Sequence, residues 1–159
     1  MECDSINSVD VDDKDLAILR ELRRDGKAKT GTLAKRTGIP TTTVHNRIKR
    51  MEEVGIIDRY VPILHHGALG FDIQACIFVT AEGGQAPDQE ALAQASLKLP
   101  GVERASILTG GYDLMLSVRV RDVAALEHLL IHGLRPLAGI DKTQTMLVLK
   151  EFDGEIDLS

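Results

Sequence analysis

Residues 13–54 contain three successive helical patterns separated by two short breaks, and this arrangement restricts the fold more than any other feature of the chain. The first pattern starts at Asp13, with Asp12 or Asp13 available as its N-cap, and ends at Gly26. The second covers about 31–37, with Thr30 as its expected cap and Gly38 suited to the left-handed position after it. The short turn 38–40 then leads into a third helix, so the chain is expected to contain a helix-turn-helix.

The third helix, predicted from Thr41 to about Val54, has one apolar stripe and one polar face. Val44, Ile48 and Met51 are spaced i, i+4 and i+7, which places them together on the buried side. The alternating run at 56–61, ended by Pro62, predicts a β-strand and therefore a wing beside the helices.

The polar face of this helix carries the residue types that recognise double-stranded DNA. Arginine and lysine donate to guanine in the major groove, and asparagine bonds adenine. Threonines at a helix N-terminus bind phosphate through hydroxyl and backbone N–H groups. Arg47 is the expected base reader, and Arg59 on the wing is an expected backbone contact. The full predicted set is Lys35, Arg36, Thr41, Thr42, Thr43, His45, Asn46, Arg47, Lys49, Arg50 and Arg59.

The charge distribution agrees with a DNA-facing N-terminal part although the whole chain has a formal net charge of -5. Residues 13–62 hold twelve Lys or Arg against seven Asp or Glu, a balance of +5, whereas residues 63–159 hold seven against thirteen, a balance of -6. This asymmetry predicts two domains, of which only the first faces nucleic acid.

The second half has the order β-α-β-β-α-β. Residues 71–81 alternate as a strand, a helix is expected over 88–99, and strands are expected at 102–109 and 112–120, joined by a tight turn at Gly110-Gly111. Tyr112, Leu114, Leu116, Val118 and Val120 are assigned to the inner face of that strand. A helix with Val123, Leu126, Leu130 and Leu134 on its apolar side and a strand at 143–149 complete the order. This order is that of the ferredoxin-like fold, in which both helices cover one face of a four-stranded antiparallel sheet. The whole chain is thus expected to be an α+β protein.

The other face of that sheet carries Cys76 and Phe78, which are too apolar for a solvated surface, so a symmetric homodimer is expected to cover it. The predicted organisation is a tail at 1–11, a winged helix-turn-helix domain at 12–61, a linker at 62–70, a ferredoxin-like domain at 71–152 and a tail at 153–159. Cys3 and Cys76 are interpreted as reduced thiols, and the acidic N-terminus and short apolar stretches favour a cytoplasmic protein without a membrane segment.

Two groups of motifs resemble the leucine-responsive regulator/AsnC (Lrp/AsnC, feast/famine) family of transcriptional regulators. The N-terminal group comprises residues 25–27, 33–39, 43–52 and 55–57, and the C-terminal group comprises 109–113 and 143–145. The resemblance extends from about Val11 to Lys150. Pro40 departs from it, because many members have a capping serine there, and this moves the expected cap to Thr41.

The resemblance implies dimers that assemble further, often to octamers, and an amino-acid or similar effector. By motif, the N–H groups of Gly110-Gly111 would meet a carboxylate, Asp113 an ammonium group, and Thr143 and Thr145 would complete the pocket. The implied effector set is Thr109, Gly110, Gly111, Tyr112, Asp113, Thr143 and Thr145. The alternative is a hairpin turn and sheet threonines without any ligand.

Two other functions compete with the DNA-binding regulator. Some proteins that resemble this family are sirohaem decarboxylases, but His65-His66 are adjacent in the linker, and His128 and His132 lie off the apolar stripe of their helix. No catalytic motif, metal site or cofactor is therefore expected, and the chain is interpreted as a non-enzyme. The other alternative is an effector-sensing scaffold that does not bind DNA.

Overall fold

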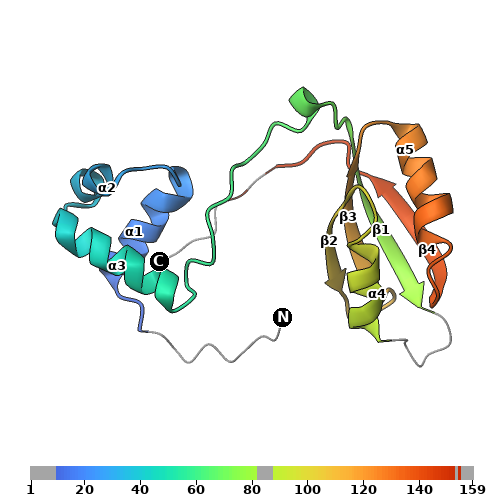
Figure 1. The fold of residues 1–159 in the computed structure, drawn as a ribbon, viewed down its shortest axis with the longest axis horizontal. Coiled ribbons are helices and arrows are strands. Elements are labelled where there is room, and N and C mark those ends of the chain that lie inside the picture. The colour runs from blue at the N-terminus through green and yellow to red at the C-terminus, as the bar shows by residue number, and fades with distance from the viewer. Residues whose placement is uncertain (1–9, 82–87, 153, 155–159) are drawn as a thin grey trace. The chain divides into compact units, whose positions relative to one another are not determined.

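The computed structural model describes residues 10–81, 88–152 and 154, which belong to two compact units divided between Leu64 and His65 (Figure 1). The tails predicted at 1–11 and 153–159 lie almost entirely outside the described residues. No helix within the described ranges is long and apolar enough to cross a membrane.

The N-terminal unit contains α1 (Asp13–Arg24), α2 (Thr30–Thr37) and α3 (Thr41–Glu53). Asp12, one of the two predicted candidates, is the N-cap of α1, and its side chain accepts hydrogen bonds from the backbone N–H groups of Lys14 and Asp15. Gly38 has φ 70°, the left-handed conformation predicted for it.

Thr30 and Thr41 are not the predicted caps but the first residues of their helices. The carbonyl of Lys29 accepts from the N–H of Leu33 at 3.1 Å, and the carbonyl of Pro40 accepts from the N–H of Val44 at 3.0 Å. The i to i+4 bonding therefore begins one residue earlier than expected in both helices.

The core of this unit is small and comes from all three helices. Ile18, Leu33, Val44 and Met51 are fully buried, and Ile39 in the turn before α3 is 7% exposed. Ile39 joins the same apolar cluster and thereby anchors the turn. The core fixes the angle at which α3 presents its other side to solvent.

The strand predicted at 56–61 does not form. Ile56 and Ile57 pack against the helical core, and the N–H of Ile57 donates to the carbonyl of Met51 at 3.0 Å. The described part of the N-terminal unit holds no strand with which this segment could pair, and a lone strand gains no ladder hydrogen bonds. Its alternation reflects two core isoleucines rather than a wing.

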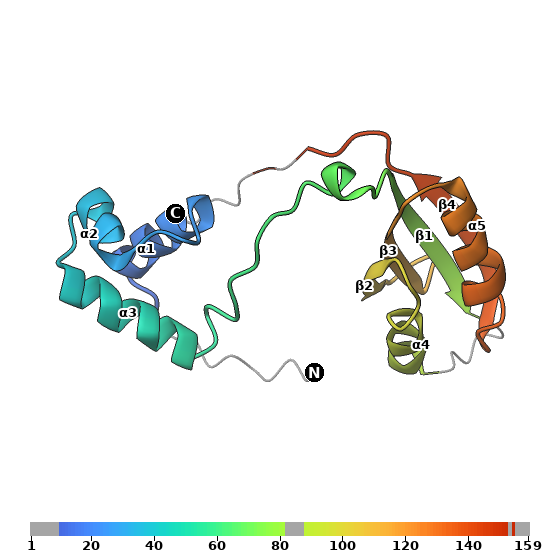
Figure 2. The same ribbon diagram turned by 45° about the horizontal axis from the view of Figure 1, so that its top comes forward.

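The C-terminal unit contains a short 3₁₀ turn, η1 (Gly67–Leu69), and then β1 (Ile73–Ala81), α4 (Gln89–Ser96), β2 (Val102–Ile107), β3 (Leu114–Val120), α5 (Val123–His128), a π-helix, η2 (Leu129–Leu134), and β4 (Ile140–Leu147). The strands form one antiparallel sheet in the order β2-β3-β1-β4 (Figures 1 and 2). This confirms the predicted ferredoxin-like fold and the α+β class.

One face of the sheet packs against α4, α5 and η2. Ala75, Ile77 and Val79 of β1 are buried there, while Cys76 and Phe78, on the opposite face, are only half-buried. The predicted register of β1 is thus confirmed. The apolar stripe assigned to the last helix was partly wrong, because Val123 is 65% exposed. Leu126 and Leu134 of the predicted stripe are buried, and the change from α to π spacing at Leu129 adds Leu129 to them, while Leu130 is only half-buried.

The β2–β3 connection is a loop from Leu108 to Asp113 rather than the predicted tight turn. The N–H of Leu108 donates to the carbonyl of Asp113 at 2.8 Å, and the N–H of Asp113 donates to Val79 at 2.9 Å. The first bond closes the loop next to the end of β2, and the second connects Asp113 to β1. Gly110 in this loop has φ 125°, which a side-chain-bearing residue rarely adopts.

Candidate DNA-binding helix and effector hairpin

The solvent side of α3 is polar over its whole length. Thr42, His45, Asn46 and Lys49 are exposed and spaced i, i+3, i+4 and i+7, so they form one continuous face. Thr41 is also exposed and Thr43 is half-buried, both in the first turn of the helix. The predicted groups for base and phosphate contacts therefore lie together on α3.

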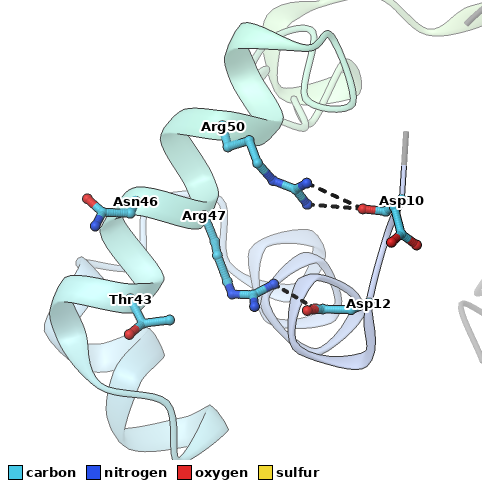
Figure 3. Close-up of a pocket in the computed structure, with 6 residues that line it drawn as sticks. All are labelled: Asp10, Asp12, Thr43, Asn46, Arg47 and Arg50. Atoms are coloured by element: carbon cyan, nitrogen blue, oxygen red, sulfur yellow. Dashed lines mark hydrogen bonds and ion pairs between the residues drawn. The ribbon is translucent and has the colours of Figure 1, made fainter. Parts of the chain in front are cut away.

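Arg47 and Arg50, in contrast, are turned toward α1. Nη1 of Arg47 lies 2.6 Å from Oδ1 of Asp12 and 2.9 Å from Oδ1 of Asp15. Nη2 of Arg50 lies 2.5 Å from Oδ2 of Asp15, and both of its terminal nitrogens are 3.3 Å from the carbonyl of Asp10. Figure 3 shows both guanidinium groups directed at the segment that precedes α1. No local pattern in the sequence indicates these partners.

Asp15 is the centre of this ion-pair cluster. Its side chain is 1% exposed, whereas those of Arg47 and Arg50 are 24% and 41% exposed. Each of its carboxylate oxygens accepts from a different arginine, and Oδ2 also accepts from the backbone N–H of Asp12 at 3.3 Å. A buried carboxylate is stable only when charged partners compensate it, so Asp15 fixes both arginines.

The cluster also changes the titration of its members. Hydrogen bonds from the backbone N–H of Asp15 and from Arg47 hold the pKa of Asp12 below its usual value. Hydrogen bonds to Asp15 and Asp12 raise the pKa of Arg47. Both shifts favour the charged forms.

A hollow of about 470 Å³ opens between α3 and the start of the N-terminal unit. Thr43, Asn46, Arg47 and Arg50 line it from α3, and Asp10 and Asp12 line it from the other side (Figure 3). The hollow therefore combines four predicted DNA contacts with two acidic residues that would repel phosphate.

The remaining predicted DNA contacts differ in their surroundings. Lys35 is exposed, and Nη1 of Arg36 lies 3.4 Å from Glu21 and 3.9 Å from Asp25. Lys49 forms an exposed i, i+4 pair with Glu53 at 3.6 Å. Arg59 is 77% exposed beside Asp58, outside any strand.

The predicted effector hairpin is held by Asp113. Its carboxylate accepts from the N–H of Ala81 at 2.8 Å and from the side-chain amide of Gln89 at 3.1 Å. It thereby connects the end of β1 and the first turn of α4 to the loop. Both carboxylate oxygens of Asp113 already accept a hydrogen bond, so an ammonium group would have to share one of them. Thr109, Gly110 and Gly111 are exposed beside it.

Tyr112 was predicted on the inner face of the sheet, but it lies on the open face. Its ring centroid is 5.1 Å from that of Phe78, and its hydroxyl donates to the side chain of Gln144 on β4. The open-face position follows from the loop, because β3 begins only at Leu114.

The predicted threonines of β4 lie on the other side. Thr143 is paired with Val79 and Thr145 with Ile77, so both share the face of the buried β1 residues. Gln144 is paired with Phe78 on the open face. The structure therefore brings Tyr112 together with Gln144, which sequence reasoning missed, and not with Thr143 or Thr145.

Three of the histidines lie beside another ring or a carboxylate. The rings of His128 and His132 are tilted by 46° with centroids 4.9 Å apart, and Nε2 of His66 lies 3.8 Å from Glu103. Across residues 10–81 and 88–152, the structure holds no group of three or more His, Cys, Asp or Glu that could bind a metal ion.

Both units match known protein families. Residues 11–52 match the AsnC-type helix-turn-helix domain, and residues 74–156 match the Lrp/AsnC ligand binding domain. An uncharacterised HTH-type transcriptional regulator of Pyrococcus abyssi is 34% identical over 146 residues, which cover 92% of this chain and 97% of that protein.

Solved structures agree with these matches. A transcriptional regulator from Neisseria meningitidis in complex with L-methionine has a TM-score of 0.86 and 27% identity, covering 94% of this chain and 97% of its own. The feast or famine regulatory protein from M. tuberculosis complexed with L-methionine has a TM-score of 0.81 and 28% identity, covering 93% and 98%.

Proposed function

Since the chain belongs to the Lrp/AsnC family of transcriptional regulators, we propose that it binds specific sites in double-stranded DNA through α3 and that an amino acid modulates this binding. The observation that carries the proposal is the exposed polar face of α3, which the helical core holds away from the rest of the unit. A helix of this kind enters the major groove with its N-terminal half against the base edges.

The contacts on α3 support a division between base-reading and backbone-contacting residues that differs from the one predicted from the sequence. Asn46 and His45 lie at the centre of the exposed face and are the base readers, because their side chains are exposed and no acidic residue in the described part of the chain is paired with them. Arg47 and Arg50 contact the DNA backbone at most, since Asp15 holds their guanidinium groups toward α1. Thr41, Thr42 and Lys49 contact phosphates at the edges of the groove.

The effector site lies at the β2–β3 loop. The exposed N–H groups of Gly110 and Gly111 receive a carboxylate, and Tyr112 with Gln144 forms a polar wall on the open face. Asp113 positions the loop through Ala81 and Gln89. An amino acid is the proposed class because two similar regulators were crystallised with L-methionine.

A homodimer covers the open face of the sheet. Cys76, Phe78 and Met115 lie together on it, and Met146, 47% exposed, continues the apolar surface on β4. Burial of such a face stabilises association through the hydrophobic effect. Dimers assemble to octamers, and the protein acts in the cytoplasm.

The test is selection of bound fragments from the organism's own DNA, with and without each amino acid, followed by salt titration of a selected site. Specific binding should weaken steeply with salt, because phosphate contacts release counterions. A chain that binds methionine but selects no DNA would be an effector-sensing scaffold. If the selected DNA were the same with and without each amino acid, the chain would have no effector of this class.

A further inference from the structure

A second cavity, of about 500 Å³, lies in the C-terminal unit at the end of the sheet remote from the Gly110 loop. It opens between the α4–β2 turn, the end of β3, and the α5–η2 helix. Its walls are largely apolar with a group of basic side chains. The lining residues are Phe71, Leu99, Pro100, Gly101, Arg119, Val120, Arg121, Ala125, His128, Leu129, His132 and Gly133. This volume lies in the range of small-molecule sites.

The polar groups of the cavity are donors. Arg119 and Arg121 bring permanent positive charge, His128 and His132 bring ring N–H groups, and no carboxylate belongs to the described lining. The chain as a whole is acidic, with a net charge of -5, so the composition of the chain does not account for four basic side chains in one cavity wall.

These donors are held in place before any ligand arrives. Nε of Arg119 donates to Glu103 at 3.1 Å, and the guanidinium of Arg121 lies 5.4 Å from the centroid of the Phe71 ring. Preorganised donors lose little conformational entropy on binding.

The helix that bears the histidines is irregular at this cavity. It changes from α to π spacing at Leu129, and the N–H of Arg135 donates to the carbonyl of Leu130, five residues back, at 3.1 Å. Single π turns of this kind are often found at functional sites. His128 and His132, four residues apart, lie side by side at the cavity wall.

Two glycines of the lining allow the wall of the cavity to pack closely. A β-carbon at Gly101 would lie 2.7 Å from Cγ1 of Val120, and one at Gly133 would lie 3.2 Å from Cδ1 of Leu129. Gly101 also has φ 91°. A side chain at either position would crowd the wall.

We propose that this cavity is a second ligand site, which binds a small carboxylate with an apolar body. The body packs on Leu99, Val120 and Leu129, and the carboxylate is received by Arg121 with the histidines. The site is separate from the Gly110 loop, because β3 has its start at that loop and its end at the cavity, roughly 20 Å further along the strand.

Binding is measured on the full chain with three probes of graded chemistry: octanoate, its neutral amide octanamide, and acetate, which lacks the apolar body. Octanoate should bind at least about tenfold more tightly than either of the others, since each lacks one of the two contacts. In amide-resolved NMR, octanoate should shift Gly101 and Gly133. Shifts confined to Gly110 and Gly111 would place the ligand in the effector loop and overturn the proposal.

Paired variants separate the charge from the shape of the site. Arg121→Gln should weaken octanoate about tenfold, whereas Arg104→Gln, exposed on β2, should not change it. Ala125→Leu fills the cavity and should abolish binding, whereas Ala124→Leu on the exposed side of α5 should not.

Equal affinity for octanoate and octanamide, or no octanoate binding at low millimolar concentration, would refute the site. Neither result would affect the proposed DNA binding, which is measured separately. If Ala125→Leu does not fold, the Arg121 and Arg104 pair still decides the outcome.

Discussion

Replacing Asp15 by asparagine tests the central contact of the N-terminal unit. The exchange keeps the shape of the side chain but removes the charge that holds Arg47 and Arg50. Breaking a buried ion pair by removing one partner costs about 3–5 kcal/mol. The two arginines stay 24% and 41% exposed, and Arg47 keeps Asp12, so water and the second carboxylate compensate part of the loss. We therefore expect a loss of about 2 kcal/mol in the free energy of unfolding of this unit.

The assay is native-state hydrogen exchange of the α1 and α3 amides, because a two-unit chain has no single unfolding transition. A loss of about 2 kcal/mol should raise the exchange rate of the globally protected amides roughly 30-fold. Asp13→Asn is the matched control, since Asp13 is exposed in the first turn of the same helix. That change should cost no more than about 0.5 kcal/mol, from the lost interaction with the helix dipole.

The same variant also tests the role of the arginines. Once released from Asp15, the Arg50 guanidinium can reach phosphate while Arg47 stays beside Asp12, so non-specific DNA affinity should rise at low salt while the folded unit becomes less stable. A double-mutant cycle with Arg47→Gln isolates the pair. A coupling energy near zero between positions 15 and 47, or equal effects of Asp15→Asn and Asp13→Asn, would refute the reasoning.

Three further predictions follow from the described contacts. Because the pKa of Asp12 is lowered in the folded state, its contribution to stability is complete above its ordinary pKa of 3.8 and is lost as pH falls through the folded value. The difference in α1 hydrogen exchange between the wild type and Asp12→Asn should therefore disappear in acid, and a difference that persists below both pKa values would contradict the assignment. Asn46→Ala should cost about 1–3 kcal/mol at a selected site and relax base preference there, whereas Arg59→Ala should weaken all sequences alike, as measured by binding to a panel of single-base operator variants. Phe78→Glu should convert dimers to monomers in light scattering. Gln144→Ala should leave the dimer intact and weaken methionine binding in calorimetry. If Phe78→Glu remains a dimer, another surface pairs the chains.

Much of the fold follows from local patterns that the sequence displays directly. The two-residue period of β1 was sufficient to assign Ala75, Ile77 and Val79 inward and Cys76 and Phe78 outward. The stripe of α3 was equally clear, because Val44 and Met51 are fully buried. Both predictions rest on repeats within one element, where backbone geometry alone sets the side-chain direction.

The errors arose where a segment needed a partner from elsewhere. The run at 56–61 has the alternation of a strand, but a strand requires a second one beside it, and its isoleucines pack on helices instead. Tyr112 continued the alternation of β3 on paper, yet β3 begins only at Leu114, and the loop before it places Tyr112 against Phe78 on the open face. Gln144 gave no signal in the sequence, because only the pairing of β4 with β1 brings it to Tyr112.

The sequence by itself therefore determined the class of the protein: a helix-turn-helix with a basic polar face, followed by a ferredoxin-like domain, since composition, period and short motifs are local properties. Only the tertiary structure decided which of the basic groups on α3 remain available. Asp15 and Arg47 are 32 positions apart, and their ion pair exists because the core packs α1 beside α3. Ion pairs depend on distance in space, which a pattern along the chain does not encode.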